Sequence, residues 1–518
     1  MSLIRALLDH SDNNNDTLSD LFLRFNGSFA LVVQTPDDIL CVVDRLRSIP
    51  LFYAKTGSRF IMADDANRIQ DQTQSLFHEK NGAEFLVTGY VTGRETLFDG
   101  ICQIQAGEYL RYSRHEDHPT TFFYHRFWHE DYFSDSEEDL LHRLDEVFIA
   151  VFERIIASVQ QHGLQIVVPL SGGLDSRIVV TMLKRLGVEE VICFSYGKNG
   201  NYESEISKKV AEALGYKWYF VEYTHDKWYQ CYHSKEASAY KHYAGNLASL
   251  PHLQDFLALQ ELKKEGKLPE KTVFIPGHSG DFLAGTYIPA DYDKLNYYSF
   301  ENYAQEILKS HYFLWDLNNE ADIFPYFKKK ISDTMGTVQI HDRESYVNQV
   351  LYFVFSERVV KFIVNSVRVY EFFGYSWRVP LWDNQLIDFF SKLPLKYRKD
   401  EYLYITYGKK ILFKNNFKVL GEIECSTELN KSPRSSVKQR CETMIYSHKI
   451  LEKLWLKIYF FKRRLYAYDS EPYFGMVQKE KFLQLFSGRQ TVNSFLVIDY
   501  LKTISASFPE KLIKKKRF

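Results

Sequence analysis

Short apolar runs separated by turn-forming residues occupy the first part of the chain. They cover residues 29–34, 39–44, 51–54, 59–63 and 108–112, with Gly, Pro, Asp and Ser between them. Runs of this length, bounded by such residues, are typical of antiparallel strands joined by hairpins. The pattern predicts a β-rich first domain over residues 1–125.

From about Leu140 the period of the pattern changes. Leu141, Leu144, Phe148 and Val151 recur at helical spacing, and residues 165–170 form a continuous apolar run of the kind found in buried parallel strands. Helical and strand-like segments then alternate, which predicts an α/β fold with a doubly wound parallel sheet and helices on both faces. This second domain is expected over residues 130–518, with a mainly helical C-terminal part. The expected elements are helices at 178–186 and 204–214, strands at 191–195, 218–222 and 272–275, and one long helix at 346–370.

Composition narrows the classes of function. The 518 residues include 65 Lys and Arg against 66 Asp and Glu, so the net charge is −1 and generic binding to nucleic acid is not expected. The N-terminal residues contain no long apolar stretch, which predicts a cytoplasmic protein without a signal peptide or membrane contact. The six cysteines are widely spaced and form no CxxC pair, a pattern typical of reduced thiols and not of a zinc site.

The segment Ser171-Gly-Gly-Leu-Asp-Ser176 follows the buried strand and opens a helix. Ligands of open α/β sheets bind at this position. Gly172 and Gly173 let the backbone approach an anion, while Ser171 and Ser176 add hydroxyl groups. A carboxylate beside a polyphosphate needs a cation between them, so Asp175 is a candidate Mg²⁺ ligand. An ordinary Gly-rich turn with an Asp cap is the competing interpretation.

These residues resemble a known family. The hexapeptide resembles the pyrophosphate loop (PP-loop) of N-type ATP-dependent ligases, and residues 169–177 resemble asparagine synthetases in particular. Three further motifs of that family have counterparts in the same order. They are P-G-H-S-G-D-F-L-A-G-T-Y at residues 276–287, G-Y-S-W-R-V-P-L-W-D at 374–383 and K-K-I-L-F at 409–413.

The resemblance implies an ATP-dependent carbon–nitrogen ligase. Such an enzyme adenylates a carboxylate, releases pyrophosphate and transfers the acyl group to an amine or ammonia, with ATP and Mg²⁺ as cofactors. Lys409 would reach the α-phosphate and the oxyanion, although Lys410 takes this place if the register slips by one residue. The resemblance assigns Leu170, Ser171, Gly172, Gly173, Asp175, Ser176, Ser195 and Gly277 to ATP and pyrophosphate, and Asp175 and Asp281 to Mg²⁺.

The chain departs from the family pattern near the expected substrate pocket. His278 replaces an acidic residue and could act as a base toward an attacking amine, or it could pack against the sheet. Glu357 is a candidate to orient it. Ser376 and Phe282 replace glutamates, and this loss of charge favours a carboxylate substrate other than aspartate, either a small molecule or a peptide.

The first domain resembles a class II amidotransferase domain of the Ntn type. The resemblance rests on residues 25–31, 44–53, 89–93 and 96–101. The family's opening segment, with its catalytic Cys after Met removal, has no counterpart, and Ser2 stands in that place. We therefore expect a degenerate, front-truncated domain without glutaminase activity, unless the start codon is incorrectly assigned or the sequence is shortened.

Other functions stay open at this point. β-Lactam synthetases and lasso-peptide cyclases share this architecture and close an amide within one substrate. An N-type pyrophosphatase acting on RNA is disfavoured by the neutral charge. A non-catalytic ATP-binding scaffold is disfavoured by the joint presence of Ser171, Asp175, Ser176, Asp281 and Lys409. The sequence leaves a homodimer open.

Overall fold

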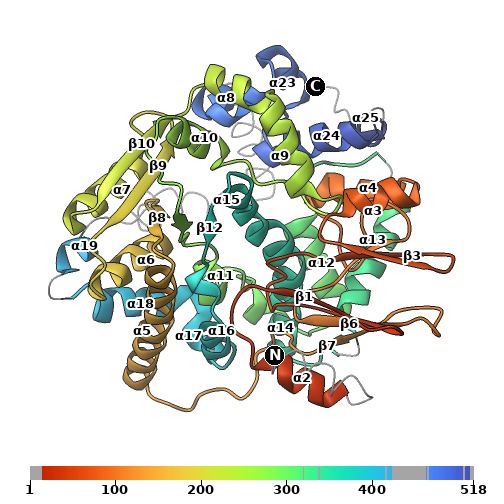
Figure 1. Ribbon diagram of the computed structural model, residues 1–518, viewed down its shortest axis with the longest axis horizontal. Helices are drawn as coiled ribbons and strands as arrows, with labels where there is room; N and C mark the ends of the chain where they lie inside the picture. The colour runs from red at the N-terminus through yellow and green to blue at the C-terminus, as the bar shows by residue number, and fades with distance from the viewer. Residues whose placement is uncertain are drawn as a thin grey trace.

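The computed structural model describes residues 15–318, 320–336, 339–414, 417–422, 463, 466–505 and 508–513. Its first part contains two antiparallel sheets with strand orders β1-β2-β6-β7 and β4-β3-β5. The first sheet consists of β1 (Ala30–Gln34), β2 (Asp38–Val43), β6 (Glu108–Ser113) and β7 (Thr120–Phe123), and the second of β3 (Phe52–Thr56), β4 (Arg59–Ala63) and β5 (Ile101–Gln103). Helices α2 (Asn15–Leu23), α3 (Ala66–Thr73) and α4 (Glu79–Thr88) accompany them. The predicted β-rich character is confirmed (Figure 1).

The second part is built around a five-stranded parallel sheet with the order β10-β9-β8-β11-β12. In the middle of β8 and throughout most of β9, consecutive residues are buried. Successive side chains point to opposite faces of a strand, so both faces of the sheet are covered, as predicted. The elements are α5 (Glu137–Gln161), β8 (Gln165–Pro169), α6 (Leu174–Arg185), β9 (Val191–Gly197), α7 (Tyr202–Leu214), β10 (Lys217–Glu222), β11 (Thr272–Phe274) and β12 (Ser376–Trp377).

Helices make up most of the remaining chain. None of the described helices is both long and apolar enough to cross a lipid bilayer. They are α8 (His225–Tyr232), α9 (Lys235–Gly245), α10 (Phe256–Lys264), α11 (Gly280–Ala284), α12 (Phe300–His311), α13 (Glu320–Met335), α16 (Asn384–Ser391), α17 (Leu395–Arg398), α18 (Tyr402–Tyr407), α19 (Lys418–Glu422), α23 (Lys479–Leu485), α24 (Val492–Ile504) and α25 (Phe508–Leu512).

The predicted long helix at 346–370 is wrong in detail. The chain is helical there, but α14 (Arg343–Phe353) passes into a π-helix at Val354–Ile363, then a 3₁₀ turn at Val364–Val367 and α15 (Arg368–Phe372). Hydrophobic spacing does not distinguish these windings, because apolar residues face the core in all of them. π-Helical segments are rare and occur frequently at functional sites.

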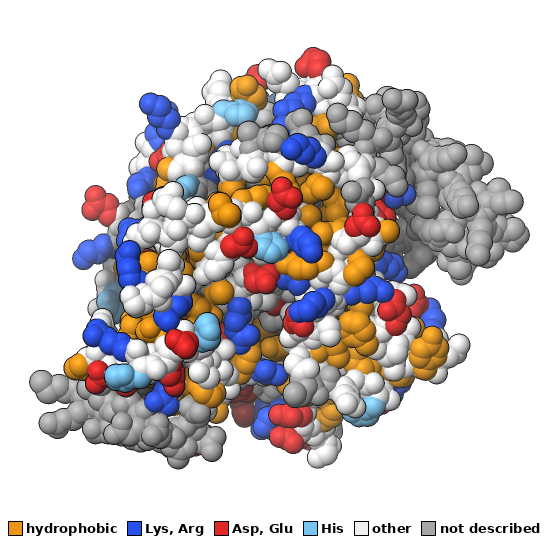
Figure 2. Space-filling model, turned by 90° about the vertical axis from the view of Figure 1, so that its right-hand side faces the viewer, with side chains coloured by type: hydrophobic (Ala, Val, Ile, Leu, Met, Phe, Trp, Pro, Cys, Tyr) orange, Lys and Arg blue, Asp and Glu red, His pale blue; other side chains and the backbone are white. Residues whose placement is uncertain are grey.

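The two parts share one hydrophobic core. Phe85, Leu86 and Tyr90 of the first part belong to the same buried cluster as Phe355 and Tyr370 of the second. The surface is mixed in character: on the face shown in Figure 2, basic and acidic side chains are interspersed among apolar ones.

Candidate active site

Two loops of the parallel sheet meet at the carboxyl ends of adjacent strands. β8 and β11 pair in register, with Phe274 beside Val167, and the chain leaves both strands at the same edge. A Cβ atom on Gly277 would lie 2.6 Å from the backbone nitrogen of Ser176, and one on Gly280 would lie 2.5 Å from Oδ1 of Asp175. Both positions therefore require glycine for the loops to touch.

This contact brings Asp175 and Asp281 together. The backbone N–H of Asp281 donates to Oδ2 of Asp175 (3.2 Å), and the Tyr404 hydroxyl donates to Oδ1 of Asp175 (2.8 Å). Burial and the nearby charge of Asp281 raise the pKa of Asp175 to about 8. Burial also raises the pKa of Asp281, and Glu401 adds to that shift. Among the described residues, neither carboxylate takes part in an ion pair, so the pair is a local excess of negative charge suited to a cation.

The hydroxyl groups of the SGGLDS loop hold its backbone in a curve. Ser171 N–H donates to the Ser176 hydroxyl oxygen (3.1 Å), and Gly173 N–H donates to that of Ser171 (3.2 Å). A Cβ on Gly172 would lie 3.2 Å from Cα of Glu203, so helix α7 packs closely on the loop. Backbone N–H groups and hydroxyls at the start of α6 form the kind of cradle that binds phosphate oxygens.

Leu170 and Ser195, two of the residues that the resemblance assigns to ATP, lie at the same edge of the sheet as Gly277. Leu170 is buried, and its N–H donates to the carbonyl of Phe194 at 2.9 Å. Ser195, the next residue of β9, is 8% exposed. The structure thus groups Leu170, Ser195 and Gly277 around the loop, and their contact with ATP stays a prediction.

The two candidate lysines, Lys409 and Lys410, lie next to each other near the SGGLDS loop. Both lie on a second π-helix, Gly408–Leu412, and both are exposed. A Cβ on Gly408 would lie 3.4 Å from Leu174, so this segment packs against the SGGLDS loop. Lys410 forms an ion pair with Glu137 (3.0 Å), which draws it toward the start of α5. Which of the two lysines serves the ligand stays a prediction, and the resemblance favours Lys409.

His278 is half-buried, and its imidazole is uncharged at neutral pH. Its Nδ1 lies 3.1 Å from the Ser366 hydroxyl. Burial lowers the pKa of His278 to about 4; Asp255 opposes this shift and His252 adds to it. Such a group is a weak base at pH 7, so its surroundings favour the packing role that the sequence left open.

The expected pairing of Glu357 with His278 needs correction. Glu357 is 2% exposed and accepts hydrogen bonds from the Gly93 N–H (2.9 Å) and from Lys361 (2.5 Å). Lys361 in turn donates to the carbonyls of Val91 and Gly93. The physical reason is the helical winding, which turns Glu357 toward the first domain and leaves Ser366 to contact the imidazole.

Sequence reasoning missed Tyr404 and Glu401. Tyr404 orients Asp175 across a separation of 229 residues, and Glu401 accepts from the Thr286 hydroxyl (2.7 Å) beside Asp281. Neither belongs to a quoted motif. Their position a few residues before the Lys409 motif was the signal available in the sequence.

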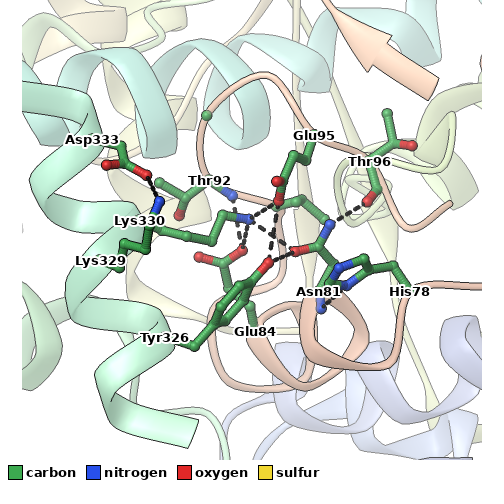
Figure 3. Close-up of polar contacts among 12 residues, drawn as sticks. His78, Asn81, Glu84, Thr92, Glu95, Thr96, Tyr326, Lys329, Lys330 and Asp333 are labelled. Carbon is green, nitrogen blue, oxygen red and sulfur yellow. Dashed lines mark hydrogen bonds and ion pairs between the residues drawn. The ribbon is translucent and has the colours of Figure 1, made fainter. Parts of the chain in front are cut away.

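A second charged cluster joins the first domain to the second (Figure 3). Lys330 on α13 points between Glu84 on α4 and Glu95, with nitrogen–oxygen distances of 2.6 Å and 3.0 Å. Asn81 accepts hydrogen bonds from Lys330 (3.0 Å) and from the Tyr326 hydroxyl (2.6 Å). Here each buried charge has an opposite partner.

Comparison with known proteins agrees with this architecture. Residues 150–415 match the family model for asparagine synthase, and residues 16–128 match that for a glutamine amidotransferase domain. No curated protein matches the chain significantly. The fold and the PP-loop site define an ATP-dependent, amide-forming ligase at the level of the family. The chain belongs to the asparagine synthase family.

Proposed function

We propose that the chain activates a carboxylate as its acyl-adenylate, releases pyrophosphate, and transfers the acyl group to an amine or ammonia with release of AMP. The contact of Asp175 with the loop that carries Asp281 supports this most directly. Two carboxylates without a cationic partner, set beside a phosphate cradle, are the donor set that Mg²⁺ bound to a polyphosphate requires. Among the described residues, no larger group of His, Cys, Asp and Glu is arranged for a metal.

Each residue then has a role that its surroundings support. Asp175 and Asp281 would hold Mg²⁺, which when bound neutralises phosphate charge. The Ser171–Ser176 loop binds pyrophosphate oxygens through N–H and hydroxyl groups. Lys409 offers a cation to the α-phosphate and to the negative charge that develops on the acyl group. Tyr404 fixes the orientation of Asp175.

The residue that follows Asp281 favours a substrate other than aspartate. Phe282 follows Asp281 directly and lies within an aromatic cluster, with ring centroids 5.3 Å from Phe127, 6.0 Å from Phe355 and 5.6 Å from Trp382. A buried phenylalanine directly after Asp281 does not offer the charge that recognition of a free amino acid needs. The carboxylate substrate is then a small molecule other than aspartate, or a peptide.

We infer further that the amine or ammonia does not come from glutamine hydrolysis by a described cysteine of the first domain. Cys41 and Cys102 lie in its sheets, and burial raises the pKa of both thiols. A glutaminase nucleophile must form a thiolate readily, which such surroundings oppose. Ser2 lies outside the described residues. Glutaminase activity of the purified chain above that of a Lys409→Ala control would contradict this inference.

ATP–pyrophosphate exchange tests the proposed reaction. The purified chain is incubated with Mg²⁺, ATP, labelled pyrophosphate and a panel of acids that includes aspartate, carboxyethyl amino acids, nucleotide-linked uronic acids and peptides. We expect exchange with at least one acid, lost in Lys409→Met by about 100- to 1,000-fold and kept in Lys410→Met. Absence of exchange with every acid would count against the ligase, and equal loss in both lysine variants would remove the special role of Lys409.

A further inference from the structure

A cavity of about 460 Å³ lies between the amidotransferase-like stretch (residues 16–128) and the helices of the second part. Phe123 and Arg126 line it from the first side, and Tyr352 and Phe355 line it from the second. Four residues of the charged cluster in Figure 3 also belong to its wall: Thr92, Glu95, Lys330 and Asp333. None of the described residues assigned to ATP or Mg²⁺ lines this space. Its volume is in the range of small-molecule sites, so the cavity can hold a ligand of its own.

Arg126 differs from the other charged residues of the cavity, because in the described chain it alone has no ion-pair partner. Its guanidinium carbon lies 4.4 Å from the centre of the Phe123 ring and 5.9 Å from that of Tyr352. No hydrogen bond joins it to a described residue, and the side chain is exposed. The other charged residues are paired: Arg94 with Glu108, Glu95 with Lys330, Asp333 with Lys329, and Glu357 with Lys361. The guanidinium of Arg126 is therefore the charged group of this lining that can pair with an incoming anion.

The hydroxyl of Tyr352 is a second donor at the same place. Tyr352 is only 7% exposed, yet its hydroxyl forms no hydrogen bond with a described residue. Burial raises the pKa of Tyr352 to about 12, so the phenol keeps its proton at neutral pH and can donate it. A phenol on a buried side chain normally has a partner, and a ligand in the cavity can supply the acceptor.

Aromatic rings give the same lining an apolar surface. The rings of Phe123, Tyr352 and Phe355 all belong to it. Phe355 also reaches toward the ligase site, because its ring centroid lies 6.0 Å from that of Phe282, the residue after Asp281. A ligand that satisfies this lining needs an oxyanion for the guanidinium and the phenol, and an apolar body for the rings.

We propose that the cavity binds a small molecule that carries an oxyanion, a carboxylate or a phosphate, on an apolar body. Arg126 and the Tyr352 hydroxyl bind the oxyanion, and the neighbouring rings contact the body. The site is separate from the ATP site, and it does not depend on the proposed reaction. Because its two donors come from different parts of the chain, the ligand bridges the amidotransferase-like stretch and the ligase part.

Fluorine NMR of the full chain tests binding with defined probes. They are 4-fluorobenzoate and 4-fluorophenyl phosphate, which distinguish a carboxylate from a phosphate, and 4-fluorobenzyl alcohol as the uncharged reference. We expect at least one anion to bind more tightly than the alcohol. Arg126→Gln should weaken its binding by about 10- to 100-fold, as for loss of a hydrogen bond to a charged group, and Arg126→Lys should recover part of the loss. Tyr352→Phe should weaken it by about 2- to 10-fold.

Arg143→Gln is the matched control. Arg143 is also exposed and lies 4.3 Å from an aromatic ring, that of Phe133, but it is not part of this lining. Equal loss of binding in Arg143→Gln and Arg126→Gln overturns the proposal, as does binding of neither anion or equal binding of the anions and the alcohol. Displacement of the probe by a non-hydrolysable ATP analogue with Mg²⁺ also overturns it, because Arg126 would then belong to the ATP site. Arg126-dependent binding in a chain without ATP–pyrophosphate exchange would contradict the ligase and support this second site.

Discussion

Within the described chain, the acidic residues of the domain interface have a cationic partner, whereas those of the ligase site do not. At the interface, Lys330 contacts both Glu84 and Glu95, and the Lys330–Glu84 pair is almost fully buried. At the ligase site, Asp175 and Asp281 face each other, and none of the ion pairs of the described chain includes them. The first arrangement is complete without any ligand, whereas the second leaves negative charge in excess.

The pKa values report the same contrast. Burial alone would raise the pKa of Glu95, but Lys330 reverses the shift and the pKa is lowered. Burial and the mutual charge raise the pKa of Asp175 instead. Paired charges of opposite sign are typical of structural contacts. Unpaired like charges are typical of a site at which a bound ligand supplies the opposite charge.

Lys330→Met is expected to have the largest effect on stability. It leaves the buried Glu84 without its cation, and breaking such a pair costs about 3–5 kcal/mol. Urea unfolding of the full chain measures the loss. Lys329→Met is the control, because the pair of Lys329 with Asp333 is exposed and contributes little to stability. Equal losses of stability in the two variants would contradict the view that the interface depends on a buried ion pair.

Asp281→Asn should have the opposite effect on stability, because it should stabilise the metal-free protein. The pKa of Asp175 is about 8 when folded and near 3.9 in an unfolded chain, so the folded state holds an extra proton between these values. Stability of the wild type therefore falls as pH rises from about 4 to about 8. Removing one charge of the pair should flatten this slope and stabilise the chain at pH 8 by about 1–2 kcal/mol, since one pKa unit is worth about 1.4 kcal/mol.

Thermal unfolding in EDTA across this pH range provides the measurement. Asp145→Asn is a useful counterpart, because Asp145 is paired with Arg185 and its loss should destabilise the chain instead. If the stability of the wild type does not fall as the pH rises, the two carboxylates do not destabilise the folded state.

Tyr404→Phe should give the smallest effect. It removes the hydroxyl that orients Asp175 and leaves the packing of the ring intact. Loss of a group that orients a metal ligand lowers metal affinity by about 10-fold or somewhat more. Mg²⁺-dependent binding of ATP, followed by calorimetry, measures the change. Tyr407→Phe, on the same helix, removes a hydroxyl that contacts Asp145 and should leave ATP binding as it is.

The sequence was informative where signals are local. The apolar run at 165–170 and the SGGLDS segment together predicted a strand, a phosphate loop and a helix start, and the family match agrees with them. It was uninformative where contacts join distant positions. Lys330 and Glu84 are 246 residues apart, and nothing in the local pattern of either predicts the pair. The π-helix at Val354–Ile363 was also missed, because its apolar spacing resembles that of an α-helix.

The shared core has a consequence for the history of the chain. Phe85, Leu86 and Tyr90 from the first domain are packed into the same apolar interior as the elements that carry the ligase site. Excising the first domain would expose that interior to water. Natural selection acting on the ligase alone would therefore preserve the amidotransferase-like fold, even in a lineage that obtains its nitrogen elsewhere.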